Sequence, residues 1–431
     1  MKKDFTKITL SNGLSVFLKE IHTAPIISSW VWYRVGSKDE VTGKTGITHW
    51  TEHMQFKGTP KFPSSVLDRA VSRDGGVWNA FTFMDWTTYF ETMPSAKIDL
   101  ALRLESDRMV NSLFDPKEVN SERTVIISER EGHENEPMFR LGETIQHAAF
   151  GIHPYRHEVI GDMADLWTIQ RDDLYRHYKT YYVPNNAVMA VAGDFDTQSM
   201  LARIRELFES IPSGPTPPRL ARPEPAQAGE ITLNVEGPGE TTFLQAAYRF
   251  PAASHPDFFP LSVLDSLLAG PSNLNMFGGG ISNRTSRLYR ALVEKEYAVG
   301  ISGGASATID PFLYTFSLTL HPRRKPAEAL AALDAEILRV QEKRVTKAEI
   351  TRAIKQARAL FAYGSESITN QAFWMGYAEM FADYNWFRAY LENLSSVTPA
   401  DVQRVARTYF RPQQRVVGMY IPTGNGSVKH G

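Results

Sequence analysis

The chain has no cysteine among its 431 residues, and this absence removes several kinds of chemistry at once. Disulfides, zinc sites built on thiolates and a cysteine nucleophile are all excluded. Any metal must therefore be held by His, Asp or Glu. The redox compartment stays open, because a chain without thiols tolerates oxidising and reducing surroundings alike.

A charge excess of either sign is missing as well. Lys and Arg number 47 against 48 Asp and Glu, so no overall field favours nucleic acid or an anionic membrane. No run of 18 or more apolar residues is present, and the basic start Met1-Lys2-Lys3 is not followed by the apolar segment of a signal peptide. We expect a globular protein without a membrane span, cytoplasmic by default and periplasmic if a signal peptide has been removed.

Two histidines and a carboxylate stand at metal-binding spacing near the N-terminus. On a helix, His49, Glu52 and His53 share one face and form the motif H-x-x-E-H. Two imidazoles placed this way can bind one Zn²⁺, and the carboxylate can take the proton of a water molecule at the metal. The alternative is an amphipathic helix whose histidines are only structural. A third ligand decides between the two, because catalytic zinc usually has three protein ligands.

A helix rich in carboxylates is predicted to begin after Asp115-Pro116 and to cover residues 117–131. Glu122 and Glu129 are seven residues apart on it, so they share a face and can both point at the helix with the histidines. This helix is therefore the place to look for the third ligand.

The order of predicted elements repeats in two halves. In the first half, strands are expected at 6–10, 14–18, 26–35, 77–83, 87–92 and 187–192, and helices at 64–71, 98–111 and 199–210. In the second half, a pair of strands within 297–316 and helices at 326–340 and 346–363 repeat part of this order.

Six prolines within residues 211–225 exclude a helix or a central strand between the halves. We therefore predict an α+β fold of two homologous sandwich-like halves, each an antiparallel-rich sheet with helices on one face. The N-terminal lobe with the zinc site is expected at 1–210, the linker at 211–228 and the C-terminal lobe, a diverged repeat without the motif, at 229–431.

An ordered set of motifs resembles the pitrilysin-like peptidases of family M16, the inverzincins, and above all their small two-lobed members, which include the mitochondrial processing peptidases. The resemblance covers nearly the whole chain. Besides residues 46–59 it rests on Gly75-Gly76, Asn79-Ala80-Phe81-Thr82, Tyr89-Phe90, Glu122-Arg123 with Val125 and Glu129, His153-Pro154-Tyr155 with Gly161, and Tyr181-Tyr182-Val183-Pro184-Asn185-Asn186-Ala187.

The resemblance implies a zinc-dependent endopeptidase or oligopeptidase that acts on unfolded peptides and binds one Zn²⁺ per chain. It implies His49, His53 and Glu129 as zinc ligands and Glu52 as the general base. Glu122 matches the second acidic position of the family, where a carboxylate supports a ligand or the water. The alternative is a solvated carboxylate of an ordinary helix.

The same resemblance implies a substrate strand. Asn79, Ala80 and Phe81 match the family's edge strand, to which a substrate peptide adds as an extra strand. The alternative is an ordinary strand without a role in substrate binding, because an Asn and an aromatic residue are common in strands. Backbone pairing of this kind suits a peptidase that accepts varied sequences.

One departure concerns the second half. The family places an Arg and a Tyr, seven residues apart, after a segment that stands here as Ser286-Arg287-Leu288-Tyr289, and both reach toward the substrate. Counted without a gap, these positions fall on Val293 and Gly300, which have no side-chain donor. In small members of the family the second lobe of one subunit completes the site in another.

The departure predicts a heterodimer in which this chain is the zinc-bearing subunit and a paralogous partner supplies Arg and Tyr. A three-residue slip would instead use Arg290 and Tyr297, which are also seven apart, and would give a homodimeric peptidase. Two further alternatives are a peptidase of targeting presequences and a non-catalytic structural subunit of the same fold, as in respiratory-complex core proteins.

Overall fold

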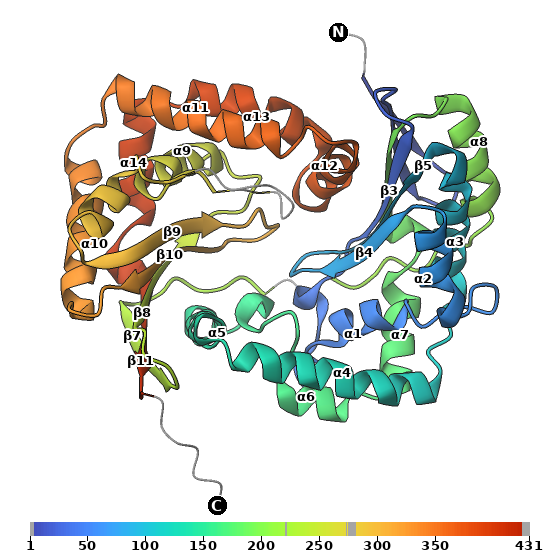
Figure 1. The fold of residues 1–431 in the computed structure, drawn as a ribbon, viewed down its shortest axis with the longest axis horizontal. Coiled ribbons are helices and arrows are strands. Elements are labelled where there is room, and N and C mark those ends of the chain that lie inside the picture. Colours follow the sequence, from blue (N-terminus) through green and yellow to red (C-terminus); the bar gives the residue numbers. More distant parts are fainter. Residues whose placement is uncertain (1–3, 220–221, 273, 275–281, 425–431) are drawn as a thin grey trace, which may run out of the picture. The chain divides into compact units, whose positions relative to one another are not determined.

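The computed structural model describes residues 4–219, 222–272, 274 and 282–424. It divides into two compact units, each of which contains one β-sheet (Figure 1). Unit 1 comprises Met1–Glu131, His157–Arg222 and Ser365–Phe387, and unit 2 comprises Gly132–Arg156, Pro223–Gly364 and Arg388–Gly431. Each unit is therefore assembled from segments of both halves of the sequence.

The sheet of unit 1 has six strands in the order β1-β2-β6-β3-β5-β4. Only β2 and β6 pair in parallel, and the other neighbours are antiparallel. This order leaves β4 at one edge, which matters for the site described below. The strands are β1 (Thr6–Thr9), β2 (Ser15–Glu20), β3 (Ile26–Tyr33), β4 (Val77–Thr82), β5 (Thr87–Pro94) and β6 (Ala187–Gly193).

The centre of this sheet is buried on both faces. Trp30, Val31, Trp32 and Tyr33 of β3 all have an exposed fraction of 0%, although successive strand residues point to opposite faces. Helix α12 (Ile368–Phe381) covers the tryptophan face.

Close packing explains a glycine in the middle of α12. The ring of Phe373 lies 5.4 Å from the rings of both Trp30 and Trp32. A Cβ atom on Gly376 would come within 2.1 Å of Nε1 of Trp32, so only glycine allows the helix to approach this closely.

The opposite face of the same sheet is covered by helices of the N-terminal half. There Tyr89 of β5 lies against the guanidinium of Arg108 from α3 (Ile98–Asn111), with 4.5 Å from the guanidinium carbon to the ring centroid. Helix α1 (Ile47–Met54), which carries the two histidines, packs against β4 and β5.

The sheet of unit 2 has five strands in the order β7-β11-β8-β10-β9. Helix α5 (Pro137–Ala149) packs on β11 so closely that a Cβ atom on Gly418 would meet the side chain of Ile145 at 2.7 Å. On the other face, the ring of Phe410, which directly follows α14 (Pro399–Tyr409), lies 4.9 Å from the ring of Tyr248. The strands are β7 (Ile231–Gly237), β8 (Phe243–Phe250), β9 (Ala298–Ala305), β10 (Phe312–Leu320) and β11 (Arg415–Pro422).

The remaining helices are α2 (Ser64–Arg73), α4 (Pro116–Glu134), α6 (Met163–Thr168), α7 (Arg171–Tyr181), α8 (Thr197–Phe208), α9 (Phe258–Leu268), α10 (Pro326–Glu342), α11 (Lys347–Tyr363), α13 (Tyr384–Ser396) and α14 (Pro399–Tyr409). The described residues within 211–228 form neither helix nor strand. Among the described residues, no helix has both the length and the apolar character needed to span a membrane.

The predicted α+β class with two sheets is confirmed, and the placement of helices on one face of each sheet needs correction. Both faces are covered, because α12 from the second half of the sequence joins the first sheet and α5 from the first half joins the second. The compact units thus differ from a contiguous division into 1–210 and 229–431. Residues Ser365–Phe387 belong to unit 1, and residues Gly132–Arg156 belong to unit 2. The physical reason is that a central strand apolar on both sides needs a cover on both sides.

Candidate metal centre

Contacts at the N-terminus of helix α1 fix its position. Gly46, just before the helix, has a φ of 84°, and a Cβ atom there would lie 2.4 Å from the carbonyl oxygen of Ile160. The carboxylate of Glu40 accepts hydrogen bonds from the backbone N–H groups of Gly46 and Thr48, both at 2.8 Å. Two N–H groups that the helix cannot satisfy by itself are paired in this way, and the negative charge suits the positive end of the helix.

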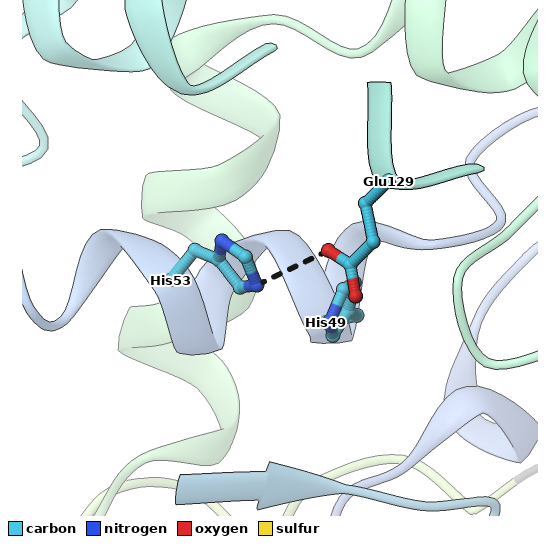
Figure 2. Close-up of side chains that lie close together, drawn as sticks. All are labelled: His49, His53 and Glu129. Atoms are coloured by element: carbon cyan, nitrogen blue, oxygen red, sulfur yellow. Dashed lines mark ion pairs between the residues drawn. The ribbon is translucent and has the colours of Figure 1, made fainter. Parts of the chain in front are cut away.

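Three potential ligands from two helices converge beside α1. His49 and His53 project from α1 with their ring centroids 4.6 Å apart, and Glu129 reaches them from α4 (Figure 2). Nε2 of His53 lies 3.8 Å from Oε2 of Glu129. One ligand atom from each of the three residues lies within 4.8 Å of those of the other two, and no other His, Asp or Glu cluster of this kind occurs among the described residues.

The donor set fits zinc. Around a tetrahedral Zn²⁺ with bonds of about 2.0–2.2 Å, ligand atoms lie about 3.4 Å from one another. The separations here are slightly wider than that, which small side-chain rotations can close. Two imidazoles and one carboxylate are also the ligand types of known catalytic zinc sites, which keep a fourth position open.

Glu122 lies behind His53 rather than beside the three converging atoms. Its Oε1 accepts a hydrogen bond from Nδ1 of His53 at 2.9 Å, and its Oε2 pairs with Nζ of Lys57. Burial opposes ionisation of Glu122, but the hydrogen bonds from His53 and Lys57 outweigh burial and lower its pKa. In the neutral imidazole of His53, the anionic Glu122 assigns the proton to Nδ1 and leaves the lone pair on Nε2, on the side of Glu129.

Glu52 is nearly enclosed, with 7% of its surface exposed. Burial raises the pKa of this carboxyl group to about 7, although a hydrogen bond from Thr82 and the proximity of His53 oppose the shift. The hydroxyl of Thr82 donates to Oε2 of Glu52 at 2.7 Å. A carboxyl group whose pKa lies near 7 can both accept and return a proton at neutral pH, as a general base must.

Asn79, Ala80 and Phe81 lie in β4, which is an edge strand of the first sheet. An edge strand presents backbone N–H and C=O groups to which another strand can pair. Here the N–H of Ala80 donates to Oδ1 of Asn79 at 2.8 Å. Since α1 packs against β4, this edge lies next to the helix that carries the histidines.

The four positions singled out in the second half all lie in unit 2. Val293 ends a π-helical turn, Tyr289–Val293, and Gly300 lies in β9, an edge strand of the second sheet. Arg290 is exposed, and the ring of Tyr297 is covered by the guanidinium of Arg324, whose carbon lies 4.6 Å from the ring centroid.

Three residues that support the site were not identified from the sequence: Glu40, Lys57 and Thr82. Lys57 follows His53 by four residues and lies just beyond α1, which ends at Met54, so its proximity to His53 could have been noticed. Thr82 follows directly on the residues assigned to the substrate strand. Glu40 has no comparable local signal, because its role depends on the fold of the loop before α1.

Comparisons with known proteins connect most of the chain with one peptidase family. Residues 15–163 match the family model described as insulinase (peptidase family M16), and residues 168–357 match the model described as peptidase M16 inactive domain. His49 and His53 thus lie in the region matched by the first family model. Most of the second half of the chain, which lacks the motif, lies in the region matched by the second family model.

Relatives and a solved structure match over nearly the full chain. Zinc protease PqqE of Helicobacter pylori is 29% identical over 424 residues, covering 94% of this chain and 90% of the relative. The mitochondrial-processing peptidase subunit beta of Lentinula edodes is 26% identical, covering 94% of this chain and 87% of the relative. The crystal structure of a protease from Helicobacter pylori superposes with a TM-score of 0.90 at 28% identity, covering 97% of this chain and 99% of that one.

Proposed function

The chain belongs to peptidase family M16, and on this premise we propose that it is a zinc-dependent endopeptidase or oligopeptidase that hydrolyses unfolded peptides. The observation that carries the proposal is the convergence of His49, His53 and Glu129, with the buried Glu52 on the same helix as the two histidines. The names of relatives, which include a zinc protease, support the metal.

His49, His53 and Glu129 would hold the zinc ion, one per chain. When bound, zinc supplies a Lewis acid that polarises the scissile carbonyl and makes water a better nucleophile near pH 7. Glu52 takes the proton from the attacking water and afterwards gives it to the amine that leaves. Glu122 keeps the Nδ1 proton of His53 in place and so directs Nε2 of that ring to the ion.

The substrate peptide is proposed to add to the free edge of β4. Asn79, Ala80 and Phe81 would then pair with it through the backbone, which ignores side-chain identity and suits varied sequences. The side chain of Asn79 would release the N–H of Ala80 as the peptide pairs with the strand.

Metal removal tests the proposal. We expect the chain, together with any partner that co-purifies from its native host, to contain one zinc ion per chain and to hydrolyse an unfolded peptide. Treatment with a chelator should abolish hydrolysis, and added zinc should restore it. Elemental analysis and the appearance of new peptide termini are the two measurements. A zinc-free protein, or hydrolysis that is indifferent to the chelator, would contradict the proposal.

Replacement of Glu122 by Gln is expected to weaken zinc binding by about 10- to 100-fold. Glutamine has one oxygen acceptor and one NH₂ donor, whereas Glu122 accepts from both His53 and Lys57, so one of these donors loses its partner. Zinc affinity, measured by competition with a chelating dye, provides the readout. Glu131→Gln is the matched control, because it removes the same charge from an exposed position of the same helix. Equal affinities for the two variants would show that Glu122 does not orient His53.

We also propose that a paralogous subunit completes the active site. Val293 and Gly300 offer no side-chain donor for the oxygen that becomes negative during hydrolysis, and Tyr297 of the alternative register packs under Arg324. One relative is, by its name, a subunit of a larger enzyme. A homodimer that uses Arg290 and Tyr297 is the alternative.

A further inference from the structure

The hydroxyl group of Thr82 connects the general base to the edge strand. It donates to Oε2 of Glu52 at 2.7 Å, and Thr82 is the last residue of β4. The end torsion of a glutamate side chain is soft, so burial alone does not fix the plane of its carboxylate. Because the group is planar, a hydrogen bond that fixes Oε2 also fixes the direction of Oε1.

Thr82 is itself held firmly. It pairs with Thr87 across the β4–β5 hairpin, and the two hydroxyl oxygens lie 3.4 Å apart. Thr87 is fully buried and donates to the carbonyl oxygen of Val35 at 3.0 Å. The backbone N–H of Phe83 donates to the carbonyl oxygen of Trp86 at 2.8 Å and closes the hairpin. A β-branched side chain at such a position has little rotational freedom.

We infer that Thr82 is a positioning residue for hydrolysis, and that its hydroxyl orients the Glu52 carboxylate toward the attacking water. The inference rests on the proposed function and adds Thr82 to the residues on which kcat for peptide hydrolysis depends. Thr82 belongs to the same short strand as Asn79, Ala80 and Phe81, so the strand that receives the peptide also holds the base. The same strand would thereby position both the substrate and the base.

Substitutions at position 82 test the inference in the full, zinc-loaded chain, together with its partner subunit where that subunit is needed for a measurable rate. Thr82→Val keeps the shape of the side chain and removes the hydroxyl, and Thr82→Ser keeps the hydroxyl. We expect the valine variant to lose about 10- to 100-fold in kcat, because a base displaced by a fraction of an ångström loses much of its effect. KM and zinc affinity should stay as in the wild type, and the serine variant should recover most of the rate.

The matched control is Thr88→Val in the neighbouring strand. Thr88 is fully buried, whereas Thr82 is half-buried, and the hydroxyl of Thr88 donates to the carbonyl oxygen of Val31 at 3.1 Å and not to Glu52. It should lower Tm without changing kcat per folded molecule. Thr82→Ala, which adds no methyl group beside Glu52, replaces the valine variant if that variant unfolds.

The outcomes separate the inference from the proposed function. An unchanged kcat in Thr82→Val or Thr82→Ala, with an active wild type, would overturn the role of Thr82 alone. A crystal structure of the valine variant with Glu52 in its original orientation would do the same. A wild type that binds zinc but never hydrolyses peptide would overturn both.

Discussion

Replacement of Glu52 by Gln is expected to lower kcat for peptide hydrolysis by about 10³-fold while zinc stays bound. The amide cannot accept the proton of the attacking water, and a positioned general base contributes about 10²- to 10⁴-fold. The ligands His49, His53 and Glu129 are untouched, so elemental analysis should still find one zinc ion per chain. Loss of zinc together with loss of rate would show that Glu52 supports the metal and does not act as the base.

The same variant has a second expected effect, on the metal-free protein. Glu52 ionises near its ordinary pKa of 4.5 in the unfolded chain and near 7 in the folded one, because burial disfavours the charge. The folded state therefore binds the proton more tightly, and stability falls as pH rises from 4.5 to 7. Glutamine carries no charge at any pH, so Glu52→Gln should raise the free energy of unfolding at pH 8 by about 3 kcal/mol and leave it nearly unchanged at pH 4.

Urea titrations of the chelator-treated wild type and variant at these two pH values provide that measurement. A gain of equal size at both pH values would mean that the variant stabilises the fold for a reason other than the buried charge. Together, lost activity and gained stability would mark Glu52 as a residue kept for chemistry at a cost to the fold.

Addition of the proposed partner is expected to raise kcat/KM of the purified chain by about 10²- to 10³-fold. This is the effect of donors that stabilise a developing oxyanion, and Val293 and Gly300 have no side-chain donor to offer. The chain alone should bind zinc and cleave an unfolded peptide slowly. Hydrolysis would be measured for the chain, for the co-purified partner and for the mixture, with the partner alone as the control.

The double variant Arg290→Ala with Tyr297→Phe distinguishes the alternative register. In the heterodimer it should leave the activity of the mixture unchanged, because these side chains are not the donors. If the wild-type chain is fully active without a partner and the double variant is inactive, then Arg290 and Tyr297 are the donors and the active species is a homodimer.

Local patterns predicted most of the elements well. The helical period of residues 98–111 predicts a helix there, and the structure has α3 at Ile98–Asn111. The helix predicted at 117–131 is α4, Pro116–Glu134, and the strands predicted at 77–83 and 87–92 are β4 and β5. These elements are encoded by side chains that lie close together in the sequence, so their spacing is visible without the fold.

The candidate ligands could be assigned because their chemistry requires particular residue types at a fixed helical spacing. His49 and His53 one turn apart need no tertiary information, and Glu129 came from the resemblance to family M16. The structure brings the three together. The supporting roles of Glu40, Lys57 and Thr82 were not predicted, because each depends on a contact with a residue of α1 or α4 that the fold creates.

By itself, the sequence determined the class of fold, the absence of thiol chemistry, and a helix whose histidines and glutamate suit zinc. Only the tertiary structure decided that α5 and α12 exchange sheets, that Glu122 stands behind His53, and that Thr82 holds Glu52. The reason is physical. Periodicity reports which side of an element is apolar, whereas the partner that covers this side, and the polar atoms that meet beneath it, depend on contacts between residues far apart in the chain.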